Sequence, residues 1–465
     1  MIDIHHEGHH RRDQLPRREW LSLGALSAVG LSLPDYLSAR EQAETTGGRS
    51  ARAASCIQIF LWGGPGAQET WDLKPAAPDA SGGAVQPSST TRPGVQFCQH
   101  LPRLAERAHQ YTIVRSATHD GVNHGTSAYH MLTGHIHWSP GTLRHPTKKD
   151  MPNLGCNAGR FLPHPAHLPA HVQLPAIIND GDNLPVPGQW GGILGDRHDP
   201  FKVLGDVTKP DFQVSSLALA EGVVRERLSR RVGLQQALET HRDHLRTTAA
   251  GLDINGKYER ALSLLQSVET ERAFDLSQEP QATRERYGIH YFGQSLLLAR
   301  RLVESGVPFV TVYWNPPEMV YNFDEESWDT HKDQHNRMRT YLLPHFDAGL
   351  AALLDDLDDR GLFDQTLVTW WGEFGRTPKI NGNGGRDHWG FCQSVGLAGG
   401  GIRRGLVYGS STPDGGYPET DPVRPDDLAA TMFHLLGIEH TQHMYDLASR
   451  PIPLSYGEPV SELLA

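Results

Sequence analysis

Acidic and histidine side chains gather in four loops, and each loop directly follows a segment that resembles a β-strand. Mixed Asp, Glu and His sets suit hard or borderline divalent metals, and no cysteine cluster accompanies them. Arginines in the same loops suit an anionic substrate group. In chain order, the loops contribute Glu69 and Asp72; His119, Asp120, His124, Thr126 and Ser127; Asp329, His331, Asp333 and His335; and Glu373, Arg376, Asp387 and His388.

Each of these motifs also has a simpler structural explanation. The alternatives are an Asx turn beside a surface histidine for Asp329 and His331, a plain turn for Asp387-His388, an ion pair for Glu373 and Arg376, and a helix cap for Glu69 and Asp72. The functional interpretation depends on convergence, because all four loops are predicted to lie at one edge of one sheet.

Four near-continuous apolar runs are typical of strands that are covered on both faces: Ile57–Trp62, Tyr111–Val114, Phe309–Trp314 and Thr366–Trp371. Helical spacing of apolar residues separates them at Leu101–Ala108, 293–305, 345–360 and 426–436. Strands that alternate with helices predict an α/β fold with a mainly parallel sheet. Ligands of such sheets bind beyond the carboxyl ends of the strands, where the polar loops begin.

The amino terminus, residues 1–53, is predicted to be a signal and linker, followed by one domain over 54–465 with a charged helical insertion at about 217–285. Arg17-Arg18 precedes Trp20-Leu21 and a short apolar run, which resembles a twin-arginine signal. An amphipathic helix at the start of the fold is the alternative. The signal implies the twin-arginine export machinery as a partner and a periplasmic or extracellular location.

Composition excludes several classes of function. The chain has 465 residues and a formal net charge of −11 without a long basic run, which argues against a nucleic-acid partner. The apolar run near the amino terminus is shorter than the ~20 residues that a spanning helix needs, so no stable membrane span is predicted. Four scattered cysteines do not predict a disulfide framework or a Cys-only zinc site.

The order of the motifs resembles that of a bacterial family of exported proteins, domain of unknown function family 1501. The matching stretches are FLWGGPGAQETWDLKP (60–75), the segment 100–135 that contains THDGVNHGTS, RERYGIHYFGQSLLLARRLVESGVPFVTV (284–312), WDTH (328–331), WWGEFGRTPKINGNGGRDHW (370–389) and RPDDLAATMFHLLGI (424–438). They cover essentially the whole of the predicted domain.

That family is similar to the alkaline phosphatase/sulfatase superfamily, which implies a three-layer sandwich. The usual nucleophile position falls on His124, so the covalent nucleophile is missing; Thr126 or Ser127 could substitute, or His124 could bind metal. The resemblance implies Asp329, His331 and His388 as metal ligands. It also implies that Glu373 keeps an oxygen ligand and that Phe374 replaces an imidazole.

We therefore expect an exported metal-dependent hydrolase of a phosphate or sulfate ester or a related anionic substrate. A divalent ion (Zn, Mn, Mg or Ca) would be held by Asp329, His331, Glu373, Asp387 and His388. Catalytic roles would fall to His119 or His124 as base, Thr126 as a replacement nucleophile, and Arg376 or Arg115 opposite the anion. The alternative is a non-catalytic periplasmic or surface protein that binds an anionic glycan or a partner.

Overall fold

A computed structural model describes residues 51–465 except 75–76, 78–84, 140–144, 181–183, 215–216, 218–262, 266 and 315–325. The predicted signal and most of the predicted helical insertion lie outside the described residues. Within the insertion, the described part contains the helices α10 (Val268–Phe274) and α11 (Gln281–Tyr287).

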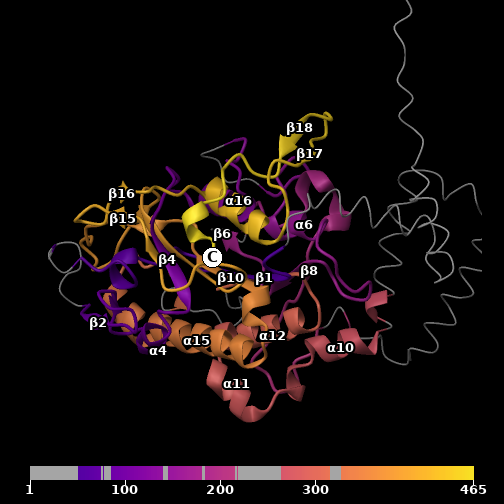
Figure 1. The fold of residues 1–465 in the computed structure, drawn as a ribbon, viewed down its shortest axis with the longest axis horizontal. Helices are drawn as coiled ribbons and strands as arrows, with labels where there is room; N and C mark the ends of the chain where they lie inside the picture. Colours follow the sequence, from indigo (N-terminus) through magenta and orange to yellow (C-terminus); the bar gives the residue numbers. More distant parts are fainter. Residues whose placement is uncertain are drawn as a thin grey trace, which may run out of the picture. The chain divides into compact units, whose positions relative to one another are not determined.

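The centre of the molecule is an eight-stranded sheet with the order β14-β4-β13-β10-β1-β9-β5-β8 (Figure 1). β13 runs antiparallel to its neighbours β10 and β4, and the other pairings are parallel. The mainly parallel sheet predicted from sequence is therefore confirmed. The strands are β1 (Ser55–Phe60), β4 (Tyr111–Ala117), β5 (Val172–Leu174), β8 (Phe201–Lys202), β9 (Phe309–Tyr313), β10 (Thr366–Trp371), β13 (Gln393–Ala398) and β14 (Val407–Tyr408).

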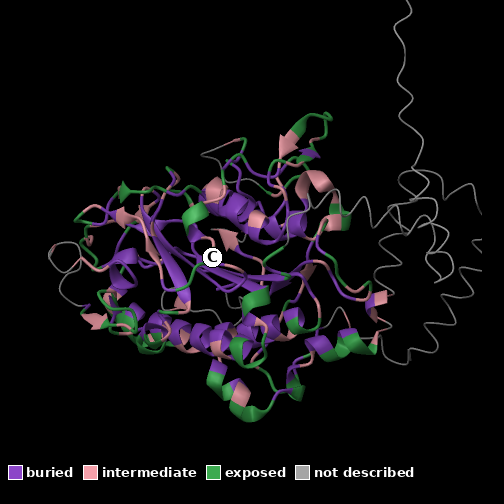
Figure 2. Ribbon diagram, viewed as in Figure 1, coloured by how far each residue is buried: buried purple, intermediate pink, exposed green. Residues whose placement is uncertain are grey.

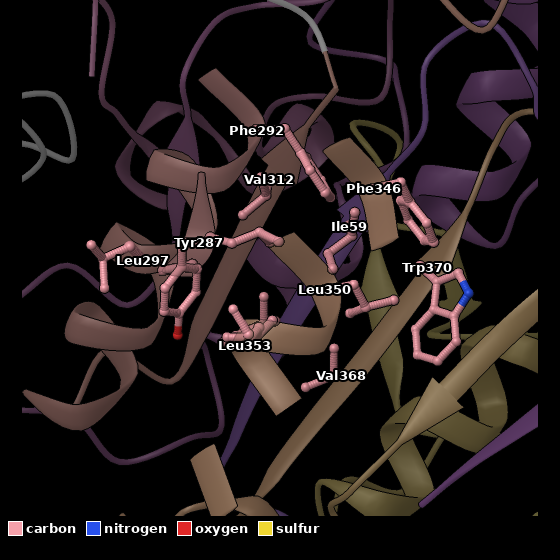
Figure 3. Packing of buried hydrophobic residues seen from close by; sticks show 14 of the residues in the cluster. Ile59, Tyr287, Phe292, Leu297, Val312, Phe346, Leu350, Leu353, Val368 and Trp370 are labelled. Atoms are coloured by element: carbon pink, nitrogen blue, oxygen red, sulfur yellow. The ribbon is translucent and has the colours of Figure 1, made fainter. Parts of the chain in front are cut away.

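Helices cover both faces of this sheet, so the strands are buried on both sides (Figures 1 and 2). On one face, Ile59, Val312 and Trp370 pack with Phe346 and Leu350 in a large apolar cluster (Figure 3). This layer contains α4 (Pro102–Glu106), α12 (Tyr291–Glu304) and α15 (Leu343–Asp359).

The opposite face carries a second apolar cluster, in which Phe60 and Trp371 of the central strands pack with Leu132 and Phe433. Its helices are α5 (His124–Thr133), α6 (Leu154–Ala158) and α16 (Pro425–Leu435). The fold is therefore the predicted three-layer α/β sandwich.

All four cysteines are buried and free (Cys56, Cys98, Cys156 and Cys392), in agreement with the sequence-based expectation that they form no disulfide framework. Burial raises the pKa of the Cys98 and Cys392 thiols to about 12. Among the described residues, none of the helices combines the length and the apolar character that crossing a bilayer requires.

Candidate metal centre

The loops that follow β1, β4, β9 and β10 leave the same edge of the sheet, because these strands point in one direction. β13 is antiparallel, so the segment that enters it also lies at this edge. That segment contains β12 (His388–Trp389), which pairs with β11 (Gly375–Arg376) after β10. Four of the predicted polar loops consequently meet here, as expected from the sequence.

Three of these loops bring histidine nitrogens against one carboxylate. His124 Nε2 lies 3.3 Å from Asp329 Oδ2, and His388 Nε2 lies 3.2 Å from Asp329 Oδ1. His331 Nε2 lies 3.2 Å from Asp329 Oδ1 and 2.9 Å from His388 Nε2. Among the described residues, one group of His, Cys, Asp and Glu could hold a metal ion with ligand atoms within 4.8 Å of one another, namely His124, Asp329 and His388.

The other ring nitrogen of each histidine faces a hydrogen-bond acceptor. His124 Nδ1 donates to Glu373 Oε1 at 2.5 Å, and His331 Nδ1 donates to Asp387 Oδ1 at 2.8 Å. His388 Nδ1 donates to the backbone carbonyl of Val122 at 2.8 Å. These acceptors place the hydrogen on Nδ1, and the neutral ring then carries its lone pair on Nε2.

In the neutral form of the rings, the three Nε2 lone pairs and the Asp329 carboxylate face one another, and this is a donor set that a cation would complete. Without a cation, protons on the Nε2 atoms of His124 and His388 take its place and donate to Asp329. The neighbouring carboxylates also determine the pKa of His124. Burial lowers this pKa, but hydrogen bonds with Asp329 and Glu373 outweigh burial and raise it to about 9.

Asp329 is held in its ionised form. Burial alone would raise its pKa, but hydrogen bonds from His124 and His388 and the nearby Arg376 guanidinium hold that pKa well below its usual range. A carboxylate that stays charged in a largely buried place is a suitable ligand for a divalent cation.

Arg376 and the loop after β1 support this carboxylate. Arg376 is completely buried, and it donates to Asp329 Oδ1 and to the backbone carbonyls of Gly63, Gly64 and Arg386. The geometry therefore assigns Arg376 to support of Asp329, which differs from the predicted contact with a substrate anion. The alternative predicted anion contact, Arg115, points elsewhere and lies 3.7 Å from Asp72.

Glu373 is also completely buried, and the backbone N–H of Gly63 donates to both of its carboxylate oxygens, at 2.9 and 3.1 Å. Together with its bond to His124 Nδ1, these contacts direct the Glu373 carboxylate at His124 and not at the Nε2 atoms. Asp387 occupies the equivalent place behind His331. Both carboxylates were predicted as metal ligands, and in the structure they face the Nδ1 atoms of His124 and His331.

Aromatic rings enclose His124 and His388. The Trp62 and Phe374 ring centroids lie 5.0 and 4.9 Å from that of His124, and the Phe374 ring stacks on His388 at 4.5 Å. His331 and Asp387 are the exposed side of the site, with 43% and 57% of their side chains accessible, against 12% for Asp329. The candidate centre is therefore open to solvent on the side of His331 and Asp387.

His119 and Thr126, two predicted catalytic residues, lie in other surroundings. His119 Nε2 donates to the backbone carbonyl of Glu373 at 2.7 Å, and its Nδ1 accepts from the N–H of Gly121 at 3.0 Å. Burial lowers the pKa of His119, which favours the neutral ring. Through its bond to the Glu373 carbonyl, this ring supports the loop after β10. The Thr126 hydroxyl contacts the backbone carbonyl of Asn123, 3.5 Å away, at the start of α5.

Two contributors to the site were missed by the sequence analysis. The Val122 carbonyl orients His388, and Asn381 donates to Asp387 Oδ1 at 3.2 Å and to the backbone carbonyl of His331 at 3.0 Å. A backbone carbonyl has no sequence signal. Asn381 stands in the NGNGG stretch before Asp387, where its residue type indicated only a turn.

The fold and the site together define an α/β protein with a His/Asp cluster at the carboxyl edge of its sheet. The chain belongs to the family described as protein of unknown function, DUF1501, whose model matches residues 53–464. The family predicted from the motifs is confirmed. No curated protein matches the chain.

Several solved structures are similar to the chain at low identity. One is a phosphonate monoester hydrolase from Silicibacter pomeroyi (11% identity, 89% of this chain and 76% of that chain, TM-score 0.39). Another is a sulfatase from a Pseudoalteromonas species (12% identity, 97% and 76%, TM-score 0.39). A third is a lipoteichoic acid synthase from Listeria monocytogenes (10% identity, 86% and 78%, TM-score 0.36).

Proposed function

We propose that the protein is an exported, metal-dependent hydrolase of a phosphate or sulfate ester or a related anionic substrate. The observation that carries the proposal is the convergence of the Nε2 atoms of His124, His331 and His388 on the ionised carboxylate of Asp329. The substrate class is supported by the resemblance of the motifs to those of phosphatases and sulfatases. The exported location is supported by the twin-arginine-like signal.

The residues of the site fit a divalent ion, which when bound would act as a Lewis acid for an anionic oxygen and lower the pKa of a water molecule. Glu373, Asp387 and the Val122 carbonyl fix the three rings so that each Nε2 faces inward. Trp62 and Phe374 exclude water from the inner side of the site.

The resemblance of the motifs puts His124 at the position of the usual covalent nucleophile. The two ring nitrogens of His124 face Glu373 and Asp329. We therefore propose direct attack by water, with the anionic ester entering on the side of His331 and Asp387, where the site is exposed.

The experiment is a panel of aryl phosphate monoesters, phosphate diesters, phosphonate monoesters and sulfate esters, tested on purified protein that lacks the signal. We expect turnover of at least one class, its loss with EDTA, and its recovery with added divalent metal. His388→Ala should abolish turnover. Asp364→Asn, which changes an exposed carboxylate paired with Arg404, should not alter it.

A protein that binds metal but turns over none of these esters would contradict the hydrolase and favour the non-catalytic binding protein. Turnover that persists in EDTA, or in His388→Ala, would place the chemistry outside this site.

A further inference from the structure

We propose that the centre takes a single transition-metal ion of the zinc type on His124, His331, His388 and Asp329, and that Glu373 and Asp387 are positioning residues that do not touch the ion. The inference deepens the proposed function and rests on the same site. It differs from the set expected from sequence, in which both carboxylates were ligands and His124 was either a catalytic base or a metal ligand.

The first argument is distance. Zinc–nitrogen bonds of about 2.0–2.1 Å at tetrahedral angles separate neighbouring ligand atoms by about 3.3 Å. The contacts between the Asp329 oxygens and the three Nε2 atoms are 3.3, 3.2 and 3.2 Å, and that between His331 and His388 is 2.9 Å. Asp329 Oδ1 and the Nε2 atoms of His331 and His388 are thus already spaced for one small ion. His124 faces the other oxygen of the same carboxylate, and its ligand atom lies within 4.8 Å of those of Asp329 and His388.

The second argument is the chemistry of the donors. Three of the four groups are imidazoles, which suit Zn²⁺, Fe²⁺, Co²⁺ and related ions, whereas Mg²⁺ and Ca²⁺ prefer carboxylate, carbonyl and water oxygens. Asp329 is the one carboxylate that meets the Nε2 atoms. The site should therefore discriminate against the two hard cations.

The third argument is the place of Glu373 and Asp387. A metal-bound histidine commonly donates its other N–H to a carboxylate or carbonyl, which fixes the ring and strengthens the ligand. Glu373 and Asp387 take this place behind His124 and His331, and the Val122 carbonyl takes it behind His388. Glu373 cannot turn easily, because both of its oxygens also accept from the N–H of Gly63.

The fourth argument concerns the number of ions. The inner side of His124 is occupied by Trp62 and Phe374, which carry no ligand atom for a second ion. Within the described part of the chain, a single group of three or more candidate ligands meets the distance requirement, and it consists of His124, Asp329 and His388, three of the four proposed ligands. A single ion follows.

The test uses the protein without its signal, stripped with a chelator and titrated with Zn²⁺, Co²⁺, Mg²⁺ and Ca²⁺ by calorimetry. We expect one Zn²⁺ or Co²⁺ per chain, visible absorption typical of tetrahedral Co²⁺, and much weaker binding of Mg²⁺ and Ca²⁺. Two ions per chain, or a preference for Mg²⁺ or Ca²⁺, would overturn the inference.

Variants separate ligands from positioning residues. His388→Ala should abolish binding. Glu373→Gln and Asp387→Asn should keep one ion per chain but weaken Zn²⁺ binding about 10–100-fold, with a shifted Co²⁺ spectrum, because they remove only the partner of a ligand. Asp364→Asn is the matched control for an exposed Asp, and it should bind like the parent protein.

Either extreme contradicts the assigned roles. Loss of binding in Glu373→Gln as complete as in His388→Ala would make Glu373 a ligand, and unchanged affinity and spectrum would deny it any role at the site. These outcomes do not depend on hydrolysis: single-ion binding without ester turnover would leave the metal assignment intact and reject only the proposed function.

Discussion

His124 shows how one residue joins two networks. It is the first residue of α5, its Nδ1 is bonded to Glu373 behind it, and its Nε2 faces Asp329. The ring sits between two carboxylates, which explains why its pKa is raised to about 9 although burial alone would lower it. At neutral pH and without metal, the ring therefore carries a proton that a metal ion must displace.

The first prediction concerns this proton. Because the pKa of His124 is about 9, each ion that binds at pH 7 should release one proton, and apparent Zn²⁺ affinity should rise about tenfold per pH unit between about 7 and 9 before it levels off. Calorimetry in buffers of different ionisation enthalpy counts the released protons. An affinity that does not change across this range would show that His124 binds no metal.

At the scale of single residues, the sequence indicated which side chains meet, but not how their atoms are oriented. Asp329, His331 and His388 were predicted as ligands, and the structure brings them together. Glu373 and Asp387 were predicted as ligands too, because residue type and spacing do not reveal which ring nitrogen a carboxylate faces. Only the three-dimensional contacts distinguish a ligand from the partner of a ligand.

Among the elements, the turn after β1 has the strictest backbone requirement. Gly63 has φ +109°, and a Cβ at this position would lie 2.3 Å from the backbone nitrogen of Asp329 and 2.7 Å from the carbonyl carbon of Trp328. The same residue donates to Glu373 and accepts from Arg376. The turn therefore fixes the positions of both Glu373, behind His124, and Arg376, behind Asp329.

The second prediction is that Gly63→Ala destabilises the protein by at least about 2 kcal/mol, from backbone strain and overpacking together, and weakens metal binding. Urea unfolding measures the free energy of unfolding, and calorimetry measures the metal. The control is Gly382→Ala, where a Cβ meets nothing within 4 Å. Equal stability of the two variants would refute the strict requirement at Gly63.

A buried ion pair connects the loop after β1 to the loop before β12. Glu69 Oε1 accepts from Arg386 Nη2 at 2.6 Å and from Nε at 2.8 Å, and both side chains are completely buried. Glu69 was expected to be a site residue or a helix cap, and the structure uses it as a tether between two site loops.

The third prediction follows from this pair. Glu69→Ala leaves the Arg386 charge buried without its partner, which should cost about 3–5 kcal/mol in the free energy of unfolding. Asp364→Ala removes the partner of Arg404 at the surface and should cost about 0–1 kcal/mol. Denaturant unfolding compares the two, and similar losses would show that burial of the first pair has no energetic consequence.

Three of the long, doubly buried strands were predictable almost completely from the sequence, whereas the shortest strands of the sheet were not. β1, β9 and β10 were found to within two residues at either end, because apolar runs bounded by glycine and proline are distinctive. β5, β8 and β14 have only three, two and two residues, too few for any periodicity. Their pairing is determined by tertiary packing.

At the scale of the whole molecule, two large apolar clusters lie on either side of one sheet, and the site lies at its carboxyl edge. The candidate ligand residues come from positions as distant as 124 and 388, so they meet only when the domain is folded. An exported protein with such a centre benefits from a route that carries folded chains.

The fourth prediction is that Arg17→Lys combined with Arg18→Lys stops export and leaves folded protein, with its metal, in the cytoplasm, because the twin-arginine route reads the paired arginines. Cell fractionation with immunoblotting measures the location. The matched control is Arg11→Lys with Arg12→Lys, which should be exported normally. Undiminished export of the first variant would rule out the twin-arginine assignment.

The burial of the four cysteines would matter for an exported protein. An oxidising envelope promotes mixed disulfides and sulfenic acids at thiols that it can reach. Cys56, Cys98, Cys156 and Cys392 are sheltered inside the packed domain, and the raised pKa values of Cys98 and Cys392 keep these two in the unreactive thiol form. A domain that crosses the membrane already folded would thus arrive with its thiols protected from oxidation. It would need no isomerase to rearrange incorrect disulfides afterwards.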